Sequence, residues 1–381
     1  MDYRANTQTN IKINNQKIIL QLLVNEGPMS RAELAKKMNS SKPTISKNVE
    51  GLLNENKIVE VGKADNLVGK KGILLDINAN YGYILVIDLS KNKFSVVVSN
   101  LKKEWIHYYN ESLDRFFEEE QTEVDMLEIL KGFIKDSQID MEKVLLVIIA
   151  YPGVVGHNDS VYLTNLKFKE VLLNQLTSYV KNVLNKKLII KNDVNLATIC
   201  EKRYGRYRDV GNLYLLSADI GVGVGIIINH QLYVGDRNAA GEVGFVLPVQ
   251  RKDGHYYTLE DRVSLHALTK RYSKLIGIEM SYNQLIVDVK SGQELANSIY
   301  LDILEDVSVA ITNIASILDI KTVVLDGRLF DIKDSMVDEL NEKINSMTPF
   351  ETVVTKTTFD KMALKGAIVV GVESIIDGLV L

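Results

Sequence analysis

In the first eighty residues, segments with apolar residues at helical spacing are followed by short strand-like runs. Ile18-Ile19 and Leu22-Leu23 place one apolar stripe on a first helix, which Gly27-Pro28 ends. Ser30 then fits an N-cap, and Glu33 three positions later completes the capping-box pattern at the start of a second helix. The pattern predicts two helices separated by a short break.

A third helix follows the turn Asn39-Ser40-Ser41. Ser41 fits its N-cap, and Pro43 suits the first helical turn. Apolar residues at helical spacing are expected to face inward: Ile45, Val49, Leu52 and Leu53. The first turns are expected to present polar residues outward: Ser41, Lys42, Thr44, Ser46, Lys47 and Asn48.

Two strands close this region, one over residues 57–61 and one over 73–77, with a basic, glycine-bearing tip at 69–72. Helix, turn, helix and two strands predict a winged helix-turn-helix domain over residues 1–78, mostly α with a β wing. In such a domain the first turns of the third helix enter the major groove of double-stranded DNA. The wing adds basic residues to the expected DNA contacts of the third helix: Lys63, Lys70 and Lys71. A three-helix bundle without a DNA role is the alternative.

From residue 81 onward, apolar strand-like runs alternate with helical patterns, and one arrangement occurs twice. Strands expected over 83–88 and 94–98 join through a short turn, as do strands over 212–217 and 224–228. Each pair gains a third strand and then strand–helix units. Alternation of this kind predicts mixed sheets with helices on both faces, in two lobes over 79–195 and 196–381.

Charge separates the first region from the rest. Residues 1–80 hold 12 Lys and Arg against 8 Asp and Glu, a net of +4, whereas the whole chain has a net charge of −4. A basic head on an acidic body favours DNA contact through the head alone. The single cysteine, Cys200, excludes a disulfide within the chain and a cysteine-rich zinc cluster. With neither a signal-peptide pattern nor an apolar run of about 18 residues, a cytoplasmic protein without membrane contact is expected.

Several short motifs lie at the ends of the expected strands. Asp88-Leu89-Ser90-Lys91-Asn92 and the glycines Gly221, Gly223 and Gly225 form the turns of the two matching hairpins. Asn192-Asp193 stands where a strand meets a helix, and Gly241-Glu242-Val243-Gly244-Phe245 follows the second half's third strand. With the internal repeat, these motifs resemble the ROK family (repressors, open reading frames and kinases), over essentially the whole chain and most closely its Gram-positive xylose repressors.

The resemblance implies an α/β, actin-like body of the sugar-kinase (ribonuclease H-like) class, with two lobes and a cleft between them. It also implies a sugar site made of Asn165, Asn192, Asp193, Glu242 and Glu260, with Asp193 at the family's catalytic aspartate. Read alone, Asn192-Asp193 could simply cap the following helix. The family's kinases carry DxGGT at the first turn, and both glycines are missing here. In the motif Leu325-Asp326-Gly327-Arg328 only Gly327 remains, and Arg328 is expected to intrude on the adenine side.

Phe245 replaces the family's zinc-binding histidine, and no cysteine follows in residues 254–264, so no metal and no cofactor are expected. The sequence thus favours a homodimeric, DNA-binding transcriptional repressor of sugar metabolism genes with a sugar effector, such as xylose, and no catalytic residues. Two alternatives stay open: an active sugar kinase with a regulatory DNA-binding head, and a repressor released by a protein partner.

Overall fold

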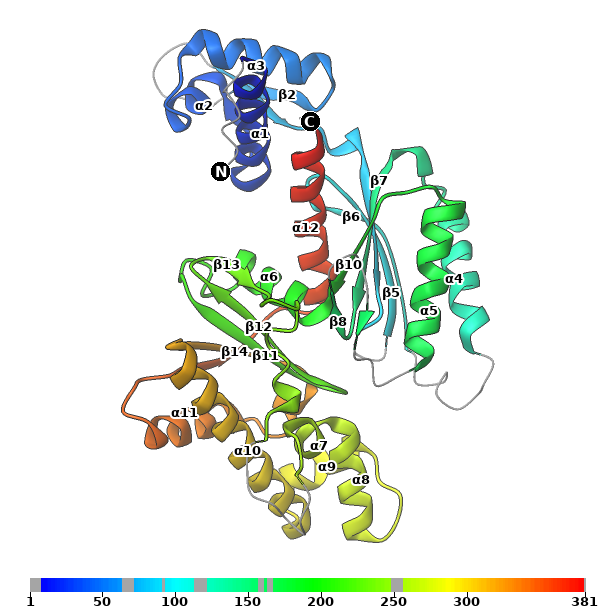
Figure 1. Ribbon diagram of the computed structural model, residues 1–381, viewed down its shortest axis with the longest axis vertical. Helices are drawn as coiled ribbons and strands as arrows, with labels where there is room; N and C mark the ends of the chain where they lie inside the picture. The colour runs from blue at the N-terminus through cyan, green and yellow to red at the C-terminus, as the bar shows by residue number, and fades with distance from the viewer. Residues whose placement is uncertain are drawn as a thin grey trace.

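A small N-terminal unit and two sheet-based lobes follow one another along the long axis of the molecule (Figure 1). The computed structural model describes residues 8–63, 72–90, 93–112, 122–156, 161–162, 167–247 and 256–379. The N-terminal unit consists of helices α1 (Gln8–Glu26), α2 (Arg31–Lys37) and α3 (Lys42–Asn54) with strands β1 (Met29–Ser30), β2 (Ile58–Lys63) and β3 (Ile73–Ile77). The strands form an antiparallel sheet in the order β1-β3-β2.

Local capping chemistry sets the helix starts in this unit. The Ser30 backbone N–H donates to Glu33 Oε2 at 2.7 Å, and the Glu33 N–H donates back to Ser30 Oγ at 3.3 Å. The bonds that the Ser30 N–H and hydroxyl donate to the Glu33 carboxylate lower the pKa of that carboxyl below its ordinary value. Ser41 Oγ accepts from the Thr44 N–H at 3.3 Å and starts α3. The capping residues predicted from the sequence are therefore confirmed.

The first lobe is built on a five-stranded mixed sheet in the order β10-β7-β4-β5-β6. Its strands are β4 (Tyr83–Asp88), β5 (Lys93–Asn100), β6 (Trp105–Ser112), β7 (Val144–Tyr151) and β10 (Leu188–Asn192). Alternate side chains point to opposite faces of a sheet. Leu85 and Ile87 face a core shared with α4 (Thr122–Asp136) and α5 (Lys167–Ser178), whereas Ile84 and Val86 face a core shared with α12 (Met362–Leu379).

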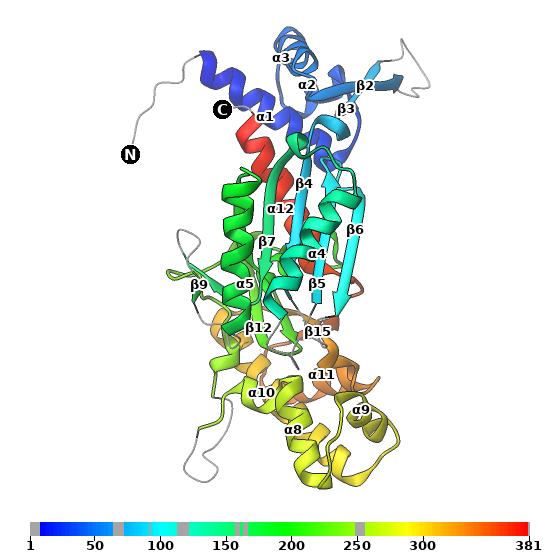
Figure 2. The same ribbon diagram turned by 90° about the vertical axis from the view of Figure 1, so that its right-hand side faces the viewer.

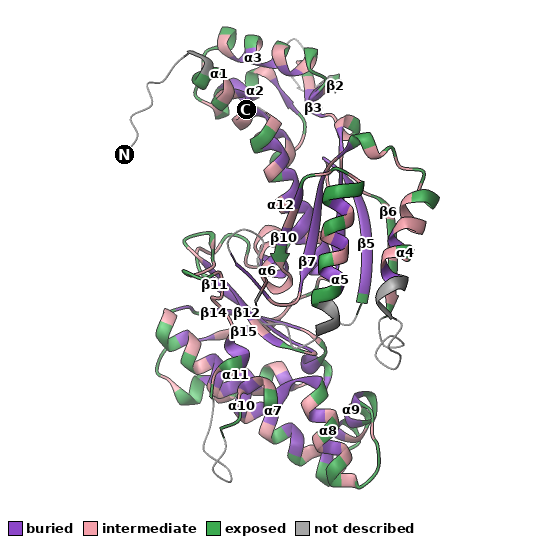
Figure 3. Ribbon diagram, turned by 45° about the vertical axis from the view of Figure 1, so that its right-hand side comes forward, coloured by how far each residue is buried: buried purple, intermediate pink, exposed green. Residues whose placement is uncertain are grey.

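The second lobe repeats this plan in the order β13-β12-β11-β14-β15. Its strands are β11 (Leu213–Ala218), β12 (Val222–Ile228), β13 (Gln231–Tyr233), β14 (Thr322–Asp326) and β15 (Val353–Lys356). One face is covered by α7 (Leu259–Val263), α8 (Leu265–Ile276), α9 (Tyr282–Lys290), α10 (Glu294–Leu318) and α11 (Met336–Met347) (Figure 2). The buried strands stand out as continuous stretches in both sheets (Figure 3). Within the described residues, no helix is both long and apolar enough to cross a membrane.

The chain passes between the two sheets twice. Helix α6 (Asp193–Tyr204) leads from β10 to β11, and the segment after β15 leads into α12. Although α12 lies within the range 196–381 expected for the second lobe, it packs on the first sheet and on α6. Gly366 makes the α6–α12 approach possible, because a Cβ there would lie 1.8 Å from the Leu196 carbonyl oxygen.

Candidate functional site in the cleft between the lobes

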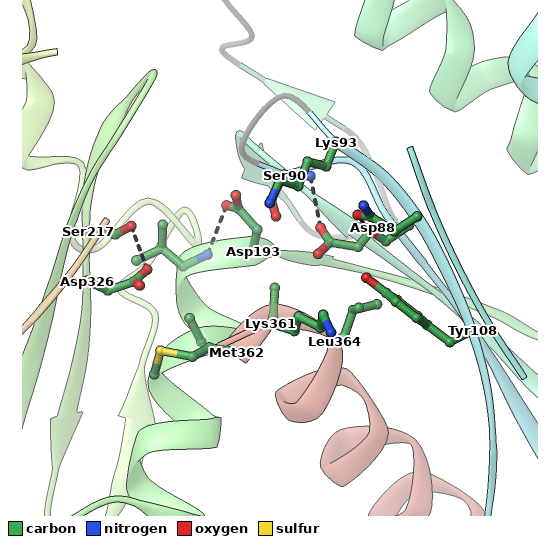
Figure 4. Close-up of a pocket in the computed structure, with 15 residues that line it drawn as sticks. Asp88, Ser90, Lys93, Tyr108, Asp193, Ser217, Asp326, Lys361, Met362 and Leu364 are labelled. Carbon is green, nitrogen blue, oxygen red and sulfur yellow. Dashed lines mark hydrogen bonds between the residues drawn. The ribbon is translucent and has the colours of Figure 1, made fainter. Parts of the chain in front are cut away.

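A cleft of about 140 Å³ lies between the two lobes, at the ends of the strands that carry the sequence motifs (Figure 4). The first sheet contributes Asp88, Ser90, Lys93, Ser95, Tyr108 and Asn110. Helix α6 contributes Asp193, Val194 and Ala197, the second sheet Ser217 and Asp326, and the start of α12 residues 361–364. The cleft therefore joins four parts of the fold.

In the described part of the first hairpin turn, the backbone N–H groups of Leu89 and Ser90 are engaged within the protein. The Ser90 N–H donates to Asp88 Oδ1 at 2.8 Å, and the Leu89 N–H donates to the Ala150 carbonyl at 3.0 Å. The Leu89 side chain is fully buried in the core beneath α4 and α5. A phosphate cradle needs backbone N–H groups that face the ligand. The N–H groups of Leu89 and Ser90 instead have protein acceptors.

Asn192 and Asp193 form the start of α6. Asn192 Oδ1 accepts from the Asn195 N–H at 2.8 Å, and its Nδ2 donates to the Gly153 carbonyl at 3.0 Å. Asn192 thus caps the helix and ties it to the loop after β7, as the alternative interpretation of this dipeptide expects. Asp193 lines the cleft, and its Oδ1 accepts from the Val194 N–H at 2.8 Å.

Glu242 and Glu260 approach each other beside the second glycine turn. Glu260, on the short helix α7, accepts from the Val222 N–H at 3.0 Å, and a Cβ on Gly221 or Gly244 would lie within 3.3 Å of its Oε2. Burial, and secondly the charge of Glu260, raise the pKa of the Glu242 carboxyl.

The position of α7 depends on a buried ion pair with α10. Arg262 Nε donates to Asp306 Oδ2 at 2.6 Å, and only 1% of the Asp306 side chain is exposed. The pair therefore helps to fix the helix that presents Glu260.

The second lobe closes the far side of the cleft through Asp326, which accepts from Ser217 Oγ at 3.1 Å. Gly327 has a φ of 108°, and a Cβ there would lie 2.2 Å from the Ala218 carbonyl oxygen. The next residue, Arg328, extends along α9: its guanidinium lies 5.5 Å from the centre of the Tyr282 ring and donates to Asn283 Oδ1 at 2.7 Å.

Of the α3 residues predicted to contact DNA, all but one are at least partly exposed. Ser41, Lys42 and Lys47 are exposed, and Thr44 and Ser46 are partly exposed. Asn48 is 4% exposed, and its Nδ2 donates to the Thr44 carbonyl at 2.8 Å. The prediction of Asn48 as a DNA contact is therefore wrong, because its side chain faces the interior of the unit.

Of the other residues predicted to bind DNA or sugar, some lie within the described part of the chain and some outside it. Lys63 is the last residue of β2, whereas Lys70, Lys71 and Asn165 lie outside the described residues. Lys93, Tyr108 and Lys361 are among the cleft residues that the sequence motifs do not indicate. Lys361 Nζ lies 4.6 Å from the centre of the Tyr108 ring. Lys361 is more than 250 positions from Tyr108 and belongs to no motif, so no sequence signal joins the two.

Comparison with known proteins identifies a family for most of this chain. The ROK family model matches residues 84–371. The xylose repressor of Staphylococcus xylosus is 26% identical over 341 residues, which cover 87% of this chain and 86% of that protein.

Two solved structures show the fold. A ROK family transcriptional regulator, described as a homologue of the E. coli MLC protein, has a TM-score of 0.74 at 19% identity and covers 97% of this chain and 98% of its own. A putative N-acetylmannosamine kinase from Listeria monocytogenes has a TM-score of 0.61 at 19% identity and covers 75% of this chain but 97% of its own. The chain has the fold of the actin-like sugar kinases in its body and belongs to the ROK family.

Proposed function

We propose that this chain is a sugar-responsive transcriptional repressor whose N-terminal unit is a winged helix-turn-helix domain over residues 1–78. The observation that carries the proposal is the unit α1–β3, which precedes the part of the chain matched by the family model. The kinase structure described above lacks a counterpart to a quarter of this chain, whereas the regulator structure and the xylose repressor match most of it.

In this proposal α3 is the recognition helix. Its first turns present Lys42 and Lys47 to solvent, together with the hydroxyl groups of Ser41, Thr44 and Ser46. Lysine and hydroxyl side chains suit contacts with phosphates and base edges. A homodimer would place two such helices on half-sites about one helical turn of DNA apart, or a multiple of that distance.

The effector is proposed to be a neutral sugar, with xylose as the first candidate. Asp193, Glu242 and Glu260 supply acceptors for sugar hydroxyl groups, and Asn165 belongs to the proposed set. Val194, which follows Asp193, is next to Gly223, since a Cβ on Gly223 would lie 3.4 Å from the Val194 side chain. Glu260 holds the neighbouring Val222 N–H. Asp193 and Glu260 therefore flank the same end of β12.

Engaged backbone donors support a regulator rather than a kinase. The N–H groups of Ser90 and Val222, one in each hairpin turn, donate to carboxylates of the protein itself. A bound nucleotide would have to displace both carboxylates before its phosphates could reach these donors.

The first test is a thermal-shift series with free pentoses, hexoses, their phosphates and ATP. A ligand that binds the native state raises the melting temperature by mass action. We expect a shift with a free sugar, D-xylose first, and none with ATP. Glu242→Gln is expected to remove the sugar shift. A shift with ATP, together with sugar-dependent ATP hydrolysis lost in Asp193→Asn, would instead establish the kinase alternative.

The second test selects binding sites from a random pool of DNA duplexes and measures their release by the same sugars in mobility-shift assays. Release by the sugar that shifts the melting temperature supports the proposal. Operator binding unaffected by every sugar, but lost in the presence of a cell extract, would favour release by a protein partner.

A further inference from the structure

Helix α12 reaches from the cleft to the N-terminal unit. Residues 361–364 at its start line the cleft, and its far end lies beside α1 (Figures 1 and 2). Its 18 residues span about 27 Å at 1.5 Å per residue. A single regular element thus connects the cleft, which Asp193 of the proposed sugar site also lines, with the proposed DNA-binding unit.

The cleft end of α12 is held by the first lobe. Lys361, in a left-handed conformation with a φ of 50°, places its amine 4.6 Å from the centre of the Tyr108 ring and 5.6 Å from that of Trp105. Both aromatic residues belong to the edge strand β6. A cation over aromatic rings is an attractive contact that depends on geometry. A shift of β6 at the rim of the cleft would therefore change the contact made at the start of α12.

The middle of α12 follows α6, the other connection between the lobes. Gly366 lies against the Leu196 backbone, and Gly371 lies against Ile84 and Ile148 of the first sheet. Because no side chain of Gly366 separates the two helix backbones, a movement of α6 that accompanied closure of the lobes would be transmitted to α12.

The far end of α12 is attached to the N-terminal unit by charged groups. Lys17 of α1 pairs with Asp377 at 2.8 Å, and Lys57 Nζ donates to the Leu379 carbonyl at 2.5 Å. Arg203, in the last turn of α6, joins three elements: it pairs with Glu373 of α12 and donates to Asn25 Oδ1 of α1 at 3.1 Å. Cations near the carboxyl end of a helix are favourably placed.

We infer that α12 is the coupling element that links the state of the inter-lobe cleft to the orientation of the N-terminal unit, with Lys361 at the input end and Arg203 at the output end. The described part of the fold gives it contacts at both ends and close backbone packing between them. This coupling would regulate the proposed function and rests on it only where a sugar is used. The coupling itself can be tested without any ligand.

The ligand-free experiment measures hydrogen–deuterium exchange of the full chain after a change at the cleft end. Lys361→Met removes the cation over Tyr108, and Lys131→Met is its matched control, because Lys131 of α4 also places its amine over an aromatic ring, that of Tyr179, but does not line the cleft. We expect amide exchange in α1 to change by about threefold or more in Lys361→Met and to stay at the wild-type level in Lys131→Met. Lys361→Arg, which keeps a cation at the rings, should restore the wild-type rate. Equal exchange in α1 for wild type and Lys361→Met would overturn the inference.

The second experiment adds D-xylose and removes the side-chain contacts of Arg203 at the output end. Arg203→Met removes the contacts with α1 and α12, and Arg208→Met is its control, because the Arg208 guanidinium is exposed and pairs only with its neighbour Asp209 among the described residues. We expect wild type and Arg208→Met to show altered exchange at both the cleft and α1. Arg203→Met should keep the change at the cleft and lose most of it in α1. Undiminished transmission to α1 in Arg203→Met contradicts this output route. No change at the cleft in wild type would contradict xylose as the effector, and exchange in Lys361→Met would then decide the coupling.

Discussion

The contact between α6 and α12 gives a sharp prediction for Gly366→Ala. Alanine favours a helix interior over glycine by about 1 kcal/mol, so an unhindered glycine should gain stability from this change. At Gly366, however, the new Cβ would lie 1.8 Å from the Leu196 carbonyl oxygen, and contacts under 3.0 Å are essentially never observed. The two helices would have to separate by more than an ångström.

The expected magnitude follows from this displacement. Overpacking a close contact costs about 1–3 kcal/mol, and a backbone obstacle belongs at the upper end because a peptide group cannot rotate away as a side chain can. Subtracting the helix-propensity gain leaves a destabilisation of about 2 kcal/mol. For a chain of 381 residues, whose unfolding entropy is about 2.1 cal/mol/K per residue, that is a drop in melting temperature of roughly 2–3 °C.

The assay is a thermal melt at one fixed scan rate, with Gly132→Ala as the control. Gly132 lies inside α4, and a Cβ there would meet no atom within 4 Å. We expect Gly132→Ala to melt slightly above wild type and Gly366→Ala clearly below it. If Gly366→Ala melted at or above the wild-type temperature, the close approach of α6 and α12 described here would be refuted.

Three further outcomes are expected. Lys47→Ala should weaken DNA binding about equally for all sequences and reduce the salt dependence by about one phosphate contact, as measured by titration at several salt concentrations; an unchanged salt slope would remove Lys47 from the interface. Glu242→Gln should melt above wild type at neutral pH without sugar. The pKa of the Glu242 carboxyl is raised in the folded state, so its contribution to stability is fully present below about pH 4.5 and is lost as the pH rises through the folded-state pKa. Melts from pH 4 to 8 should therefore show the melting-temperature difference between Glu242→Gln and wild type shrink toward low pH. A difference that grew toward low pH would contradict the assignment. Asp306→Ala should destabilise the second lobe by about 3–5 kcal/mol, because it leaves Arg262 without its buried partner, and denaturant unfolding would measure the loss; a cost below about 1 kcal/mol would show that the pair does not anchor α7.

Much of the fold could be predicted because its signals are local. Capping at Ser30 and Ser41 depends on residues three positions apart, and the strands of both lobes appear as apolar runs bounded by turns. Helix α12 is harder to predict, because 11 of its 18 residues are buried on several sides and the sequence shows no clear polar face.

Sequence reasoning located only part of the candidate sites, and the error at Asn48 could have been avoided. Asn48 lies three positions after Ile45 and just before Val49, so helical periodicity alone places it on the buried face. Lys93 and Lys361 line one cleft only because the β4–β5 hairpin and the distant start of α12 come together there. Contacts of that kind depend on tertiary topology and leave no pattern in a single sequence.

The apolar cluster around α12 has a consequence for how the protein can be divided. Ile19 and Leu20 of α1 belong to the same cluster as Ile148 of the first sheet and Ile375 of α12. An N-terminal unit excised near residue 78 would expose this shared surface to water and lose part of its own interior. The N-terminal unit is therefore a poor candidate for fusion to an unrelated protein. An exchange of N-terminal units between related chains should include α12 as well. Calorimetry of the intact chain is expected to show the head and the first lobe melting in one shared transition.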